Sequence, residues 1–115
     1  MHELGIAQEI IDRVAREMRH RPAARARSVG VKIGEISSVD RDALTFGFEA
    51  LIKDTEWQRL ALEIEYCLRR HRCPDCGTEF NVHDFDTSCI ACGNTNTVMI
   101  SGDELDIGYI EVDDE

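Results

Sequence analysis

The sequence lacks any apolar run near the roughly 20 residues that a membrane-spanning helix needs. Its first ten residues, MHELGIAQEI, contain neither a basic segment nor a long apolar stretch, so we expect mature sequence and no secretory signal peptide. These two absences argue against a membrane protein and against a secreted one. We expect a cytoplasmic protein.

Basic charge is also scarce, with 13 Lys and Arg against 23 Asp and Glu, which gives a formal net charge of −10. Residues 103–115 hold much of the acidity. Such a chain is a poor candidate for binding nucleic acid or anionic membranes without a local basic patch. Aromatic residues make up only 6%. The one basic cluster that favours nucleic acid is Arg69-Arg70-His71-Arg72.

Signs of an enzyme are missing as well. The sequence shows no nucleophile–base pair and no phosphate-binding loop, and 115 residues leave little room for a substrate pocket. The composition, 43% hydrophobic and 31% charged, is that of an ordinary globular domain. Because so short a chain buries only a modest core, a bound metal would help to stabilise it. We therefore expect a small binding protein and no catalysis.

Hydrophobic periodicity predicts an α+β fold: a small two-helix, three-stranded mixed sheet domain with an inserted zinc-ribbon-like module. Ser37 or Ser38 is the expected N-cap of the second helix, which should end near Ile52. A slip of the apolar phase after Gly34 suggests a β-bulge. The other predicted elements are a helix over residues 4–19 and strands over 28–36, 60–66 and 104–112.

Five cysteines are present, and four of them form two CxxC pairs, each followed by glycine, namely Cys73, Cys76, Cys89 and Cys92. A glycine there permits a tight turn with positive φ, so that backbone amides point at the sulfurs. This spacing fits one tetrahedral four-sulfur site, which selects zinc or an iron–sulfur centre. With no other redox signature, a structural Zn²⁺ is favoured. A redox-active pair is the alternative, and the closed zinc site would have no catalytic role of its own.

For three residues near these pairs, the sequence allows two alternative roles. Cys67 fits a packed thiol, with a metal or redox role as its alternative. His71 and His83 fit solvated or hydrogen-bonded side chains, with exchange as metal ligands as theirs.

The N-terminus, Met1-His2-Glu3, could bind a second metal. The α-amine of Met1, the amide nitrogen of His2 and its imidazole can form fused chelate rings, a nitrogen set that nickel(II) and copper(II) accept. Glu3 or Asp40 would supply a further donor. A frayed terminus without metal is the ordinary alternative.

Taken together, several segments resemble the hydrogenase nickel-incorporation proteins, the HypA/HybF family of nickel metallochaperones. The similarity extends over essentially the whole chain. It includes MHEL at the N-terminus, VKIGE and SSVD before the second helix, ALTFGFE within it, LEIE before the CxxC pairs and SGDEL after them. The combination of the MHE start, the paired CxxC turns and SGDEL is specific, although each part alone is not.

This resemblance implies a nickel-binding α/β domain, residues 1–66 and 101–115, and a zinc-binding domain, residues 67–100. It places the cargo Ni²⁺ at His2, with Met1 and Glu3 around it and Asp40 as a further candidate, and structural Zn²⁺ on the four cysteines. The implied partners are the maturation GTPase HypB and the large subunit of a [NiFe]-hydrogenase. Urease accessory proteins are candidates too, and a monomer or weak homodimer is expected. The alternative is a zinc-ribbon module that binds nucleic acid or RNA polymerase.

Overall fold

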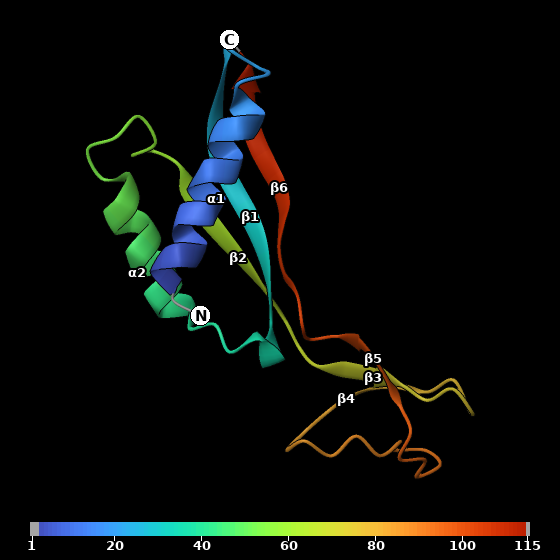
Figure 1. Ribbon diagram of the computed structural model, residues 1–115. Coiled ribbons are helices and arrows are strands. Elements are labelled where there is room, and N and C mark those ends of the chain that lie inside the picture. The colour runs from blue at the N-terminus through green and yellow to red at the C-terminus, as the bar shows by residue number, and fades with distance from the viewer. Residues whose placement is uncertain (1–2, 115) are drawn as a thin grey trace. The chain divides into compact units, whose positions relative to one another are not determined.

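The computed structural model describes residues 3–114 of the chain, which form two compact units (Figure 1). The first unit contains the residues up to Lys32, Val39–Glu65 and the residues from Asp106 on; the second contains Ile33–Ser38 and Tyr66–Leu105. No helix in the described part is long and apolar enough to cross a membrane.

Two amphipathic helices belong to the first unit: α1, Glu3–Met18, and α2, Arg41–Ile52. The predicted helices are both present; they pack against each other, and each buries one apolar face. The buried members are Ile6, Ala7, Ile10, Ile11 and Val14 of α1 and Leu44, Phe48 and Ile52 of α2.

The start of α2 differs from the prediction. Residues Glu35–Ser37 form a short 3₁₀ helix, η1, and Ser38 has a left-handed φ of 65°. Neither serine caps α2. The cap is Asp40, whose carboxylate accepts hydrogen bonds from the backbone N–H groups of Asp42 and Ala43. The prediction of a cap at Ser37 or Ser38 was therefore wrong.

A three-stranded sheet contains β1, Ala24–Gly34, β2, Ala61–Cys67, and β6, Leu105–Asp114, in the order β2-β1-β6. The sheet is mixed, since β1 and β2 run in the same direction and β6 runs opposite to them (Figure 1). This arrangement confirms the predicted fold class. Strand β1 begins four residues earlier than expected, and in place of a bulge it ends at Gly34, where η1 follows.

Tyr109 on β6 contacts both of the other strands of this sheet. Its ring lies over Gly30, so that a Cβ atom added there would come 2.2 Å from the ring. Its hydroxyl donates a hydrogen bond to the Glu63 carboxylate on β2. Because ionisation would lose that bond and place a phenolate beside a carboxylate, the pKa of Tyr109 is raised to about 12.

The second unit has its own antiparallel sheet of three short strands: β3, Arg70–Arg72, β4, Glu79–Asn81, and β5, Val98–Ser101. Their order is β4-β3-β5, and His71 on the central strand pairs with Phe80 on one side and Met99 on the other. Sequence periodicity did not predict these strands, because none is longer than four residues. The small apolar core of this unit consists of Cys73, Phe80, Val82 and Cys89.

Two glycines let backbone segments approach closely within this unit. Gly34 donates its N–H to the Glu104 carbonyl at 2.7 Å, and Ile36 donates to the Gly102 carbonyl at 2.8 Å. A Cβ atom on Gly34 would lie 2.1 Å from the Gly102 oxygen. Gly102 itself has a φ of 121°, which side-chain-bearing residues rarely adopt. The backbone conformation at Gly102, the glycine of the SGDEL segment, therefore requires glycine.

Candidate metal sites

Each CxxC pair sits on a tight turn built by the same two backbone hydrogen bonds. In the first turn, the N–H of Cys73 donates to the Thr78 carbonyl at 2.9 Å, and the N–H of Gly77 donates to the Cys73 carbonyl at 2.8 Å. The second turn repeats both bonds with Cys89, Asn94 and Gly93. Gly77 and Gly93 each have a φ of 77°, which confirms the positive φ predicted for these glycines.

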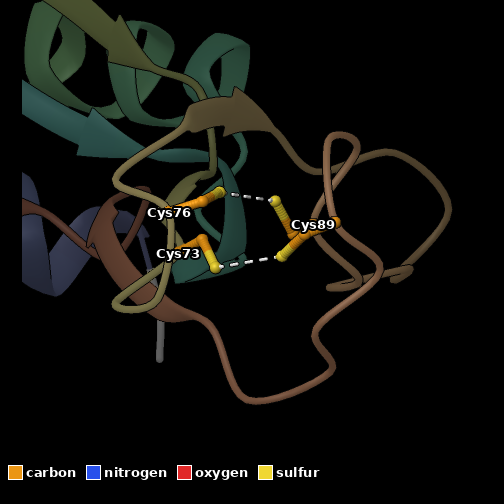
Figure 2. A group of neighbouring side chains, drawn as sticks. Cys73, Cys76 and Cys89 are labelled. Carbon is orange, nitrogen blue, oxygen red and sulfur yellow. Dashed lines mark hydrogen bonds between the residues drawn. The ribbon is translucent and has the colours of Figure 1, made fainter.

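The two turns face each other and bring the four cysteine sulfurs together (Figure 2). All four Sγ atoms lie within 4.8 Å of one another. The Sγ atoms of Cys73 and Cys92 are 3.6 Å apart, as are those of Cys76 and Cys89. Since a disulfide would need a separation of about 2.05 Å, all four thiols are free.

These distances match a tetrahedral metal site. With metal–sulfur bonds of about 2.3 Å, the edges of a tetrahedron are about 3.8 Å long, close to the observed 3.6 Å. Two sulfurs come from each turn, so one ion would join residues 13 to 19 apart in sequence. The cluster is therefore suited to binding zinc, and its four protein ligands would leave no open coordination position.

The protein around the sulfurs lowers the thiol pKa of Cys73 and Cys76 and raises that of Cys92. The Thr78 hydroxyl lies 3.2 Å from the Cys76 sulfur and, with a backbone amide, lowers the pKa of Cys76 to about 6. At Cys92, the backbone amide of Asn94 acts in the same direction. There, however, the hydrogen bond with Cys73, burial and the other thiols outweigh it and raise the pKa to about 12. A divalent cation would stabilise all four thiolates and displace the remaining protons.

Polar groups next to the cysteines complete the surroundings of the cluster. The side-chain amide of Asn94 lies 3.7 Å from the Cys73 sulfur and donates to the Asp75 carboxylate at 2.8 Å. The N–H of Ala91 points at the Cys89 sulfur at 3.4 Å. Sequence reasoning missed Thr78 and Asn94. Their shared position, directly after the glycine of each CxxCG turn, was the signal that could have identified them.

His71 is buried, and both of its ring nitrogens are hydrogen-bonded. Thr97 donates its hydroxyl proton to the Thr87 carbonyl, so its oxygen must accept the Nδ1 proton of His71 at 2.9 Å. Nε2 then accepts from the Arg69 guanidinium at 3.2 Å. Burial first, and Arg69 second, lower the pKa of His71, which favours the neutral ring.

Among the described residues, the metal-binding group contains the four cysteines alone, without either histidine. His83 is exposed and forms a β-bridge with Asp86 in a turn. Cys67 is half-buried and free of disulfide bonding.

At the other predicted site, the structure brings Glu3 and Asp40 together. Glu3 opens α1, and its carboxylate accepts the backbone N–H of Asp40 at 3.1 Å. This hydrogen bond is the main reason why the pKa of Glu3 is lowered. The amino ends of α1 and α2 are thus joined through two acidic residues. Met1 and His2, the other members of the predicted site, lie outside the described residues.

The fold and the sulfur cluster define a small α+β protein with a tetracysteine, metal-binding module. The family model described as "Hydrogenase/urease nickel incorporation, metallochaperone, hypA" matches residues 1–112. The chain belongs to this HypA family of nickel metallochaperones, which confirms the resemblance seen in the sequence.

Curated relatives match this chain over nearly their whole length. The hydrogenase maturation factor HypA of Chlorobium luteolum is 36% identical over 115 residues, which cover 100% of this chain and 98% of the relative. That of Geobacter metallireducens is 35% identical over 113 residues, covering 98% and 100%.

Two solved structures share the fold, each at 24% identity. A solution structure of a HypA protein has a TM-score of 0.72 and covers 100% of this chain and 98% of the other. The solution structure of the nickel metallochaperone HypA from Helicobacter pylori has a TM-score of 0.65 and covers 100% of both chains.

Proposed function

We propose that this chain carries Ni(II) at its N-terminus and delivers it during maturation of a [NiFe]-hydrogenase. The observation that supports this most is the match of residues 1–112 to a family of hydrogenase and urease nickel-incorporation proteins. A metallochaperone transfers its cargo without transforming a substrate, so we propose no enzymatic activity. The maturation GTPase HypB, the hydrogenase large subunit and urease accessory proteins are the proposed partners.

The proposed nickel donors are the α-amine of Met1 and the amide and imidazole nitrogens of His2, with an oxygen from Glu3 or Asp40. Glu3 follows His2 directly in the chain, and its carboxylate is bonded to the Asp40 N–H. The amino end of a helix carries partial positive charge, which disfavours a cation. The carboxylates of Glu3 and Asp40 offset that charge. Because the nitrogen donors belong to the chain end, a small backbone movement would release the ion.

The test is calorimetric titration of nickel into tag-free, zinc-loaded protein. We expect His2→Ala, or a Gly-Ser extension before Met1, to remove the high-affinity nickel site. His20→Ala is the matched control, because His20 is exposed beyond the other end of α1 and should leave binding unchanged. Zinc content should remain the same in every variant. Unaltered nickel stoichiometry and affinity in His2→Ala would reject the terminal site.

For the four cysteines we propose one structural Zn²⁺, which would hold the two CxxC turns of the second unit in place. The support is the fit of the sulfur separations to zinc–thiolate geometry. A reducing compartment such as the cytoplasm would keep these thiols available for metal, and we propose that location. Metal analysis of the purified protein, with one zinc expected per chain, tests this assignment against an iron–sulfur centre.

The alternative, a zinc-ribbon module for nucleic acid or RNA polymerase, has little support from the second unit. Of its basic cluster, Arg69 is bonded to His71 and Arg70 pairs with Glu79 at 3.7 Å. These two side chains are engaged within the protein. A salt-dependent gel shift with DNA or RNA at physiological ionic strength would restore this alternative.

A further inference from the structure

A groove of about 830 Å³ lies within the first unit, at the carboxyl ends of its helices. Figure 1 shows that α1 and α2 end on the same side of this unit. The groove is lined by the end of α1, the turn that follows it, the start of β1 and the loop 55–60 after α2. Glu3 and Asp40, the described residues of the proposed nickel site, lie at the opposite, amino ends of the helices.

Four exposed arginines line the groove: Arg19, Arg21, Arg25 and Arg59. Three of them, Arg19, Arg25 and Arg59, have no side-chain hydrogen bond or ion pair with another described residue. Other arginines of the chain do have carboxylate partners: Arg13 with Glu17, Arg27 with Glu111 and Arg70 with Glu79. The groove therefore gathers guanidinium groups whose donors are available, on a protein whose net charge is −10.

The same groove has an apolar wall. Trp57, the one tryptophan of the chain, is half-buried there, and Leu60 beside it is buried. Met18 and Pro22 contribute further apolar surface. An indole that is partly open to solvent offers a flat face for an apolar side chain or for the stem of a charged one. The groove thus combines exposed positive charges with an apolar wall.

We propose that this groove binds an acidic segment of a partner protein, in which carboxylates flank an apolar side chain. Each guanidinium presents a rigid fork of N–H donors that fits a carboxylate in two-point contact. The apolar side chain would pack on Trp57 and Leu60. Since the rest of the protein is acidic, an acidic partner would be attracted locally and repelled elsewhere, which fixes its orientation.

Two features favour carboxylates over phosphates as the bound groups. The carboxyl end of α1, which carries partial negative charge, and the Glu56 side chain both border the groove. They oppose the dense charge of a polyphosphate more than single, spaced carboxylates. A long nucleic-acid strand would also have to extend over a surface with an excess of acidic groups.

Trp57 permits a direct test, because its fluorescence reports on the groove alone. The probe is a synthetic peptide of about twelve residues built from Glu-Glu-Leu repeats, titrated into full-length, zinc-loaded protein. We expect a saturable change in Trp57 emission that weakens as NaCl is raised. Replacing Arg19, Arg25 and Arg59 together by Gln should weaken binding about tenfold, the effect of losing three exposed ion pairs.

The matched control replaces Arg13, Arg16 and Lys32 by Gln, which removes the same charge outside the groove, and binding should stay within about twofold of the wild-type value. Should the groove triple variant not fold, Arg59→Gln alone should weaken binding about twofold to threefold. Equal losses in the two triple variants, or no change in Trp57 emission, would overturn the proposal. So would tighter binding of oligothymidylate or inorganic tripolyphosphate than of the peptide.

Discussion

Replacement of Asp40 separates two roles that this residue could combine. In the structure, its Oδ1 atom accepts hydrogen bonds from the N–H groups of Asp42 at 3.0 Å and Ala43 at 3.1 Å, which caps α2. Its carboxylate also belongs to the proposed nickel site. Asp40→Ala removes both the cap and the charge, whereas Asp40→Ser keeps a capping oxygen and removes only the charge.

The expected loss of stability follows from the cap. Removing an aspartate N-cap costs about 1 kcal/mol, and loss of a negative charge at a helix start adds roughly 0.3–1 kcal/mol. Asp40→Ala should therefore lower the free energy of unfolding by about 1–2 kcal/mol, and the melting temperature by several degrees. Asp40→Ser should lose only the smaller, charge-dependent part. The backbone N–H that Glu3 accepts is retained in both variants.

The assay is urea unfolding of zinc-loaded, nickel-free protein followed by circular dichroism at 222 nm, which reports mainly on α1 and α2. Nickel binding is measured separately by calorimetry. If the Asp40 carboxylate contributes to the nickel site, both variants should bind nickel more weakly although only Asp40→Ala is clearly less stable. Equal destabilisation of the two variants would refute the capping argument. Wild-type nickel affinity in Asp40→Ser would remove Asp40 from the ligand set.

Three further predictions concern the sulfur cluster, the buried histidine and the sheet. Because the pKa of Cys92 is about 12, this thiol is protonated at pH 7, and zinc binding should release at least the Cys92 proton. The heat of zinc binding should then depend on the ionisation enthalpy of the buffer, and a buffer-independent heat would contradict the prediction. Because the pKa of His71 is lowered in the folded protein, the neutral ring contributes to stability above the ordinary pKa of 6.5. This contribution is lost as the pH falls below 6.5. Unfolding of zinc-loaded His71→Gln between about pH 6.5 and 5 should accordingly depend less on pH than that of the wild type, and identical profiles would argue against this. Gly30→Ala places a Cβ atom 2.2 Å from the Tyr109 ring and should destabilise the protein by about 1–3 kcal/mol. In a double-mutant cycle measured by thermal unfolding, Tyr109→Ala should recover part of that loss, and strictly additive effects would count against the ring clash.

Local pattern was sufficient for the parts of this protein that depend on neighbouring residues. The apolar spacing in α1 and α2 predicted two helices, because one helix face must be buried. The CxxCG repeats predicted two turns with glycine at positive φ, because two nearby thiols can face one ion only on such a turn. The family followed from motifs spread along the whole chain, and the match to residues 1–112 confirmed it.

Where the sequence allowed several local structures, its pattern predicted the wrong structure or none. Ser37, Ser38 and Asp40 are all competent N-caps, and only the 3₁₀ turn over Glu35–Ser37 decides that α2 starts after Asp40. The strands of the second unit are too short to show periodicity. They form because backbone groups that flank the cysteine turns must be hydrogen-bonded once those turns come together.

The sequence by itself identified the candidate metal ligands: two thiol pairs, the histidine at position 2 and nearby carboxylates. Tertiary structure alone decided that the two thiol pairs meet at 3.6 Å and that Glu3 lies against Asp40. It also decided that Arg19, Arg25 and Arg59 share one groove with Trp57. These outcomes depend on contacts between residues far apart in the chain, and such contacts are set by packing of the whole unit and not by local sequence.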